Sequence, residues 1–299
     1  MRLYSINKIS VIGAGTWGTA ISNLIASNGN NVMLYHYNAD FIDTLNKTRI
    51  HPNLNNVRLN QDIQLTSSKT DLSECDYLFV AIPTKSIRDF LIDFKLSSET
   101  PIISLSKGIE IGTNMFPSEI ISSTLNHSMQ KICVLSGPTH AEEVSKKIPS
   151  AIVAASSNTS LNISIQHLLS TSSFRVYSNS DLRGVELSGA LKNVISIASG
   201  ICIGLGFGDN TIAALISRGL NEMLKLSSIY NTKISTFYGL AGIGDLTVTA
   251  FSNHSRNRNF GISVGQGNVS LECISNSKMV VEGFYTSKAL NDIIIENNL

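Results

Sequence analysis

Short, nearly continuous apolar runs alternate with longer, partly polar segments through the first 180 residues of the chain. The first run covers residues 9–12, and a segment of helical pattern follows at 19–27. Similar runs recur at residues 32–35, 77–82, 102–105, 132–135, 151–155 and 174–177. Apolar strands separated by helices are typical of a parallel sheet covered by helices on both faces. We therefore predict an α/β, Rossmann-type, doubly wound parallel sheet in residues 1–179.

The pattern changes near residues 178–180. Asp181 has the side chain of a helix N-cap, and beyond it apolar positions recur at spacings of three and four. These positions form one apolar stripe, made of Leu187, Leu191, Val194, Ile195 and Ala198. Because strand-like runs largely disappear here, we predict an all-α C-terminal domain in residues 180–299.

A G-x-G-x-x-G motif of Gly13, Gly15 and Gly18 joins the first strand to the first helix. In a dinucleotide-binding turn the first glycine allows the tight turn, the second lets the backbone approach a pyrophosphate, and the third lets the helix pack on the strand. N–H groups at the helix start then face the phosphate charge. A glycine-rich turn without a ligand is the alternative, but the strand before and the helix after favour cofactor binding.

Three polar clusters follow later strands, at residues 83–84, at Lys107 and at 137–139. In a parallel sheet, ligands bind beyond the carboxyl ends of the strands. These clusters are therefore expected at the edge of the sheet that also carries the glycine motif.

The second strand ends in His36-Tyr37-Asn38, with no carboxylate before Asp40. An NAD-specific site usually has an acidic residue here, which holds the ribose 2′-hydroxyl. The sequence therefore does not support strict NAD specificity. A 2′-phosphate could be accepted near His36, with Lys47 or Arg49 close by, or these could be ordinary loop residues, so NADP or NAD is the expected cofactor.

Two groups in the second half could carry chemistry. Lys192 lies at the flank of the apolar stripe, where it is either an acid/base residue of lowered pKa or a lysine that reaches past the apolar surface to solvent. Asp245 follows two glycines in 242–244, which predicts a tight turn that presents a carboxylate. Ser255, Arg256 and Asn257 offer a phosphate grip, and an exposed basic loop is the alternative.

Composition narrows the class of protein. Charged residues make up 15% of the chain, against about 25% in an average soluble domain, and the net charge is only +1. We therefore expect no nucleic-acid partner and no anionic membrane surface as the main partner. The apolar run 194–206 is short and broken by glycine, so no stable membrane insertion is predicted. Four scattered cysteines, no metal-like histidine spacing and no signal-peptide pattern predict a cytoplasmic protein without a metal site.

At this point the sequence resembles the bacterial-type NAD(P)-dependent glycerol-3-phosphate dehydrogenases over nearly its whole length. The motifs that carry the resemblance are GAGTWGTA (13–20), SKGIE (106–110), SGPTHAEEV (136–144), VELSGALKN (185–193), GIGDL (242–246), SRNR (255–258) and VEG (281–283). The resemblance implies a helical domain like the C-terminal domain of 6-phosphogluconate dehydrogenase, a homodimer, and a role in phospholipid synthesis. It also implies interconversion of sn-glycerol 3-phosphate and dihydroxyacetone phosphate by hydride transfer at C2.

The resemblance further implies roles for individual residues. Lys192 would be the general acid and base at the C2 oxygen, which agrees with the ability of an ammonium to stabilise and protonate a developing alkoxide. The implied substrate-binding residues are Lys107, Gly137, Thr139, Lys192, Asp245, Ser255, Arg256 and Asn257. The implied cofactor-binding residues are Gly13, Gly15, Thr16, Trp17, Gly18, His36, Lys107, Ala141, Arg256, Val280 and Glu282.

The chain departs from the family pattern at three places. Thr139 stands where many relatives have serine, and His36-Tyr37-Asn38 replaces a stretch that often contains arginine. The chain also ends at Leu299, whereas relatives usually continue through a last helical segment, so a shortened C-terminus is expected. A related two-domain reductase for another small phosphorylated or acidic substrate, or a non-catalytic NAD(P)-sensing protein, are the alternative functions.

Overall fold

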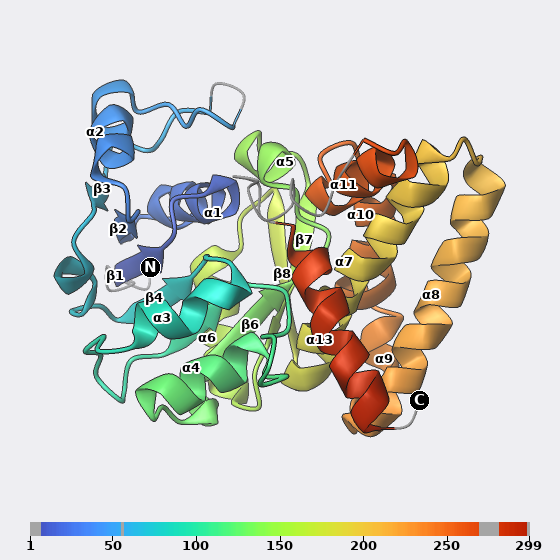
Figure 1. The fold of residues 1–299 in the computed structure, drawn as a ribbon. Coiled ribbons are helices and arrows are strands. Elements are labelled where there is room, and N and C mark those ends of the chain that lie inside the picture. Colours follow the sequence, from blue (N-terminus) through green and yellow to red (C-terminus); the bar gives the residue numbers. More distant parts are fainter. Residues whose placement is uncertain (1–6, 55–56, 269–280, 298–299) are drawn as a thin grey trace.

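The computed structural model describes residues 7–54, 57–268 and 281–297. Within these ranges, eight strands form one sheet in the order β3-β2-β1-β4-β5-β6-β7-β8 (Figure 1). The strands are β1 (Lys8–Ile12), β2 (Asn31–Tyr35), β3 (Ile63–Thr66), β4 (Tyr77–Val80), β5 (Ile102–Ser104), β6 (Ile132–Ser136), β7 (Ser150–Ala155) and β8 (Phe174–Asn179). Seven of them were predicted; β3 was not, because its sequence IQLT has no continuous apolar run.

The first six strands are parallel, as predicted, but β7 pairs with β6 in the antiparallel sense. β8 then runs parallel to β7, so the last two strands are reversed relative to the rest. The predicted parallel sheet is therefore confirmed for most of its pairings, and the β6–β7 pairing is an antiparallel exception at this edge. Strands buried on both faces are apolar throughout, and such runs carry no signal of direction.

Helices cover both faces of the sheet. They are α1 (Thr16–Ser27), α2 (Ala39–Thr48), α3 (Ile87–Leu91), α4 (Pro117–Leu125), α5 (Ala141–Ser145) and α6 (Thr159–Leu169), with short 3₁₀ turns at Lys69–Leu72, Thr84–Ser86 and Met129–Lys131. Ile21 and Ile25 of α1 pack on one face with Val11, while Ile120 and Ile121 of α4 belong to the cluster on the other face. The sheet is thus the core of a three-layer domain.

The remaining helices form the second part of the molecule, on the right in Figure 1. They are α7 (Leu182–Gly204), α8 (Asp209–Ile229), α9 (Ile234–Phe237), α10 (Asp245–Phe251), α11 (Arg256–Gly265) and α13 (Glu282–Glu296), with one π-helical turn at Leu240–Gly244. The expected boundary at residues 179/180 falls between the end of β8 and Asp181. As predicted, Asp181 caps α7, because its carboxylate accepts a hydrogen bond from the Gly184 N–H at 3.0 Å.

Helix α7 is the central element of the helical part. It packs against α8, α10, α11 and α13 and also against β6. Its first three turns are buried nearly all round, so the single apolar stripe predicted for it understates its burial. In the described residues α7 is also the one helix long and apolar enough to cross a membrane by length and composition, with 56% of that stretch buried inside the protein.

The reversal of β7 and β8 sets the path of α7. Because β8 ends at the edge opposite the glycine motif, α7 begins there and runs back along the sheet. Lys192 lies about ten residues into the helix, or about 15 Å at 1.5 Å per residue. That distance is close to the length of β6, about 16 Å at 3.3 Å per residue, so Lys192 arrives at the edge that carries the ligand loops.

Helices α7 and α11 cross at very close range. A Cβ on Gly200 would lie 2.0 Å from the Arg258 carbonyl oxygen, and one on Gly261 would lie 2.1 Å from the Ile197 carbonyl oxygen. Gly204 and Gly265 repeat the arrangement one turn later. The crossing therefore fixes where α11 begins relative to Lys192.

Candidate active site

The glycine loop, residues 13–18, covers the turn after β1 and the first three residues of α1. Gly13 has φ +109°, and a Cβ on it would lie 2.6 Å from the Ala81 carbonyl oxygen. A Cβ on Gly18 would lie 1.9 Å from the Gly13 carbonyl oxygen, so helix and turn are in backbone contact. A Cβ on the exposed Gly15 would meet no atom within 4 Å. The loop therefore leaves open space at the N-cap of α1, as binding of a pyrophosphate requires.

Three predicted cofactor residues lie in this loop or beside it. Thr16 is the first residue of α1, and Trp17 is half-buried beside it. Ala141 begins α5, and it shares a small apolar cluster with Ala20 and Leu54, against which Trp17 packs. α1 and α5 are in contact, so the structure brings these three residues together.

His36 follows β2 and stacks on Tyr37 with ring centroids 4.6 Å apart. Its Nδ1 accepts a hydrogen bond from the Asn38 N–H at 3.2 Å, so a neutral ring keeps its proton on Nε2. Burial lowers the pKa of His36, against a smaller raising effect of the Asn38 bond. Arg49 is turned elsewhere, because its guanidinium donates to the carbonyls of Asn60 and Ile63. At the end of β2, His36 therefore offers a hydrogen bond rather than a positive charge.

A buried charged cluster of Lys107, Lys192 and Asp245 lies at the same edge of the sheet. Lys107 follows β5, Lys192 is on α7, and Asp245 is the first residue of α10. Lys107 Nζ lies 2.6 Å from Asp245 Oδ2, and Lys192 Nζ lies 2.8 Å from Asp245 Oδ1. Lys192 is 7% exposed and Asp245 is 2% exposed. One lysine from the sheet part and one from the helical part thus share a single carboxylate, so the cluster has one positive charge in excess when both amines are protonated.

The pKa of Lys192 is lowered from 10.5 to about 8. Burial is the largest cause and the charge of Lys107 adds to it, while Asp245 acts in the opposite direction. For Asp245, burial alone would raise the pKa. The charges and hydrogen bonds of the two lysines more than offset this, so its pKa lies below the ordinary value. Asp245 is therefore an anion at neutral pH, and Lys192 can gain or lose a proton near it.

Thr249 and Ser136 complete the surroundings of this cluster, and the sequence interpretation missed both. Thr249 Oγ1 accepts a hydrogen bond from Lys192 at 2.8 Å and donates one to the Asp245 carbonyl at 2.6 Å. Ser136 Oγ donates to Asp245 Oδ2 at 3.5 Å. Thr249 follows Asp245 by four residues on the same helix face, which is the one sequence signal that could have identified it.

Residues 137–139 lie next to the cluster, as predicted. The Gly137 carbonyl accepts a hydrogen bond from Lys107 Nζ at 3.4 Å, and another from Thr139 Oγ1 at 3.2 Å. The predicted tight turn before Asp245 is in fact the π-helical turn, which runs directly into α10. Asp245 therefore projects from a helix rather than from a loop.

The predicted phosphate residues form the start of α11 rather than an irregular loop. Ser255 is the N-cap, and its buried hydroxyl accepts a hydrogen bond from the Arg258 N–H at 3.2 Å. Arg256 is exposed. Asn257 is held on both sides, because it donates to the Asn193 side chain at 2.9 Å and accepts from the Gly283 N–H at 3.0 Å. Asn193, next to Lys192, thus links α7 to this helix start.

Glu282 begins α13 and reaches the first domain, where its carboxylate accepts a hydrogen bond from the Thr84 N–H at 3.0 Å. Burial raises the pKa of Glu282 to about 7, against the lowering effects of that bond and of the Arg256 charge. Glu282 therefore connects the two halves of the molecule close to Arg256. Val280, the other predicted cofactor residue here, lies outside the described residues.

Family models match both halves of the chain. The N-terminal model of NAD-dependent glycerol-3-phosphate dehydrogenase covers residues 8–162, and the C-terminal model covers residues 181–299. The chain belongs to this family. A glycerol-3-phosphate dehydrogenase [NAD(P)+] of Halothermothrix orenii is 46% identical over 96% of this chain and 84% of the relative. That of Staphylococcus carnosus is 42% identical over 98% of this chain and 90% of the relative.

Solved structures agree with this assignment. The glycerol-3-phosphate dehydrogenase of Coxiella burnetii has 32% identity and a TM-score of 0.92 over 98% of this chain and 91% of its own. A D-mandelate dehydrogenase shares only the fold, at 12% identity and a TM-score of 0.67. The chain is therefore an NAD(P)-dependent oxidoreductase of the glycerol-3-phosphate dehydrogenase family, as the sequence predicted.

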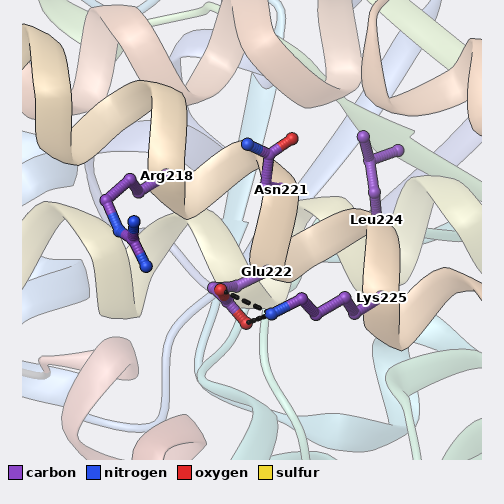
Figure 2. Close-up of a pocket in the computed structure, with 5 residues that line it drawn as sticks. All are labelled: Arg218, Asn221, Glu222, Leu224 and Lys225. Carbon is purple, nitrogen blue, oxygen red and sulfur yellow. Dashed lines mark hydrogen bonds and ion pairs between the residues drawn. The ribbon is translucent and has the colours of Figure 1, made fainter.

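A surface hollow on α8 contributes no candidate residue of this dehydrogenase. Figure 2 shows its lining, with Lys225 Nζ bound to the carboxylate of Glu222 at 2.9 Å. The other side chains drawn there are Arg218, Asn221 and Leu224. α8 lies at the outer edge of the helical part in Figure 1. The candidate site residues lie away from this hollow, at the sheet edge and on the helices next to it.

Proposed function

We propose that this chain interconverts sn-glycerol 3-phosphate and dihydroxyacetone phosphate, with Lys192 as the general acid and base at the C2 oxygen. The observation that carries the proposal is the buried contact of Lys192 with Asp245 and Lys107. It places an ionisable ammonium at the sheet edge that also carries the glycine loop. Family membership supplies the reaction, and the cluster supplies the proton chemistry.

The glycine loop fits a dinucleotide. Gly15 leaves open space at the start of α1, and Gly13 and Gly18 have no room for a side chain. Thr16, Trp17, Ala141 and His36 would hold the cofactor along this edge, with Lys107, Arg256 and Glu282 nearer the second domain. The bound nicotinamide supplies or accepts the hydride. Since neutral His36 brings no positive charge, we expect both NADH and NADPH to be used.

Lys192 moves the proton. A pKa of about 8 leaves it mostly protonated at neutral pH, so it can protonate the oxygen that becomes negative as the ketone is reduced. In the oxidation direction the neutral amine accepts the proton from the C2 hydroxyl. Asp245 holds the lysine in place, and Lys107 lowers its pKa.

The start of α11 is the proposed phosphate site. Free N–H groups at a helix N-terminus favour anions, and an arginine can grip a phosphate with two parallel hydrogen bonds. Arg256 is exposed at this point, and Asn257 is positioned by Asn193. The Ser255 hydroxyl already caps the helix, so its part is to shape the site. Gly137 and Thr139 would contact the other end of the substrate.

The direct test is oxidation of NADH and of NADPH by the purified chain with dihydroxyacetone phosphate, followed at 340 nm. We expect turnover with both cofactors that depends on the substrate. Cofactor binding without turnover would instead support a sensing protein, and turnover only with another keto acid or sugar phosphate would support a different reductase.

We also propose a homodimer in the cytoplasm that supplies glycerol 3-phosphate for phospholipid synthesis. Large apolar side chains are exposed on the helical part, at Leu205, Phe207, Ile234 and Tyr238. The two pairs lie at opposite ends of α8 and form no single patch, so the family resemblance is the main support for a dimer. Light scattering on the purified protein tests this, and a mass of one chain would contradict it.

A further inference from the structure

His51 lies under the glycine loop, in a segment that no prediction above singled out. It is 2% exposed, and its Nε2 lies 3.1 Å from the carbonyl oxygen of Ala14, between Gly13 and Gly15. On the other side of the ring, Nδ1 lies 3.2 Å from the backbone nitrogen of Asn53. The imidazole therefore connects the loop to the segment that follows α2.

These two partners fix the state of the ring. A backbone N–H can only donate, so Nδ1 accepts and carries no proton, while a carbonyl can only accept, so Nε2 carries the proton. Burial lowers the pKa of His51, against the raising effect of the Ala14 bond, and the nearby His36 lowers it further. His51 is thus a neutral imidazole that donates one hydrogen bond to the glycine loop.

The bond has a direct consequence for ligand binding. In a trans peptide the C=O and the following N–H point in opposite directions. Holding the Ala14 oxygen inward on His51 therefore turns the Gly15 N–H outward, toward the open space at the start of α1. We propose that His51 is a positioning residue for the dinucleotide: it orients the Ala14–Gly15 peptide so that its N–H meets the pyrophosphate.

His51 is also linked to the ribose end of the site. Its ring lies 5.7 Å from the Phe41 ring in an edge-on contact, and Phe41 lies 4.5 Å from His36. The segment is anchored next to the loop by Leu54, which is fully buried with Ala20 of α1 and Ala141 of α5. His51 thus contacts the loop that would hold the pyrophosphate and, through Phe41, His36 at the end of β2, where the ribose would lie.

The test compares three variants of the full chain. Trp17 is the only tryptophan and lies in the loop, so quenching of its fluorescence by NADH or NADPH measures cofactor affinity without turnover. We expect His51→Leu to raise both dissociation constants about tenfold, the cost of one misplaced buried hydrogen bond. His51→Gln should restore most of the affinity, because its amide nitrogen reaches the Nε2 position. The KM for dihydroxyacetone phosphate at saturating cofactor should change less than about twofold.

His127→Leu is the matched control. His127 is 4% exposed, and its Nε2 also contacts a backbone carbonyl, that of Thr100 at 2.9 Å. The His127→Leu variant should lower the melting temperature about as much as His51→Leu does, but it should leave cofactor affinity unchanged. Equal affinities in wild type and His51→Leu, or equal losses in the leucine and glutamine variants, would overturn the proposal.

Two further outcomes are separated by the same titration. If His51→Leu does not fold, His51→Asn replaces it, because asparagine ends at the Nδ1 position and cannot reach Ala14. A cofactor affinity of His51→Asn equal to that of His51→Gln would then overturn the proposal. The inference rests on the proposed function, and a wild-type chain that does not bind NADH or NADPH would refute that function instead.

Discussion

The glycine loop is proposed to bind the cofactor through backbone atoms of one short segment, whereas the charged cluster joins side chains from the loop after β5, from α7 and from α10. In the loop, function depends on the absence of side chains, and Gly15 is exposed. In the cluster, Lys192 and Asp245 are buried and each charge depends on the others. A backbone site thus depends on the conformation of its own segment and on the groups that hold it, while a buried charged site responds to any change of a member.

Replacing Lys192 should have the largest effect. Lys192→Ala is expected to lower kcat for dihydroxyacetone phosphate about 10³-fold, because general acid catalysis contributes roughly 10²–10⁴-fold. Cofactor affinity, measured by Trp17 fluorescence, should stay within about twofold of wild type. Turnover equal to that of wild type would refute the catalytic role of Lys192.

Alanine in the glycine loop should act on the cofactor instead. A Cβ on Gly18 would lie 1.9 Å from the Gly13 carbonyl, so Gly18→Ala must displace the loop, and we expect a loss of cofactor affinity of about 100-fold together with lower stability. Gly15→Ala is the matched variant. Because a Cβ there would meet no atom within 4 Å, we expect an unchanged melting temperature but weaker cofactor binding. If Gly15→Ala binds NADH as wild type does, the pyrophosphate does not approach this residue.

Arg256 tests the outer part of the substrate site. Arg256→Ala should raise the KM for dihydroxyacetone phosphate about 30-fold, since hydrogen bonds to charged groups contribute about 1.5–3 kcal/mol. Arg258→Ala, two residues later on α11, is the control, because that guanidinium donates to Asn253 at 3.0 Å. A rise only in the cofactor KM would assign Arg256 to the cofactor.

The pH dependence follows from the pKa of about 8 at Lys192. Reduction needs the protonated amine, so kcat/KM should be constant below that pH and fall about tenfold per unit above it. Oxidation needs the neutral amine, so its kcat/KM should rise over the same range. Profiles from pH 7 to 9.5 in both directions, with Lys192→Arg as a non-titrating control, test the assignment, and parallel slopes in the two directions would contradict it.

His36 should have the smallest effect. Because the ring is neutral, it offers one hydrogen bond and no charge, so His36→Ala is expected to weaken NADH and NADPH about threefold each. The ratio of the two dissociation constants should therefore stay the same. A loss confined to NADPH would show that His36 carries a positive charge when the 2′-phosphate is bound.

The two sites also differ in how far the sequence predicted them. The glycine loop is local, so spacing alone located Gly13, Gly15 and Gly18 between a strand and a helix. Lys107, Lys192 and Asp245 were each singled out from the residue pattern, but their roles were assigned through resemblance, because no periodicity reveals that three elements converge on one carboxylate. Thr249 was missed because its hydrogen bond with Lys192 forms only when α7 and α10 pack against each other.

Other misses have physical causes too. The reversal of β7 was not predicted, because a fully buried strand has the same composition in either direction. His51 sits in an irregular segment without periodicity, and its bond to Ala14 crosses from the end of α2 to the end of β1. Asp181 was predicted correctly because helix capping is a local property of the chain.

The close crossing of α7 and α11 has a consequence for redesign of the substrate range. Where Gly200 faces Gly261 and Gly204 faces Gly265, backbone meets backbone, so these positions offer no side chain that could be trimmed to shift the helices. The spacing between the Lys192 amine and the proposed phosphate site at the start of α11 is thus fixed by backbone contacts. An engineered enzyme for a longer phosphorylated ketone would need extra residues in the 252–255 connection. Point changes in the two helices would either leave the spacing unchanged or disrupt the crossing.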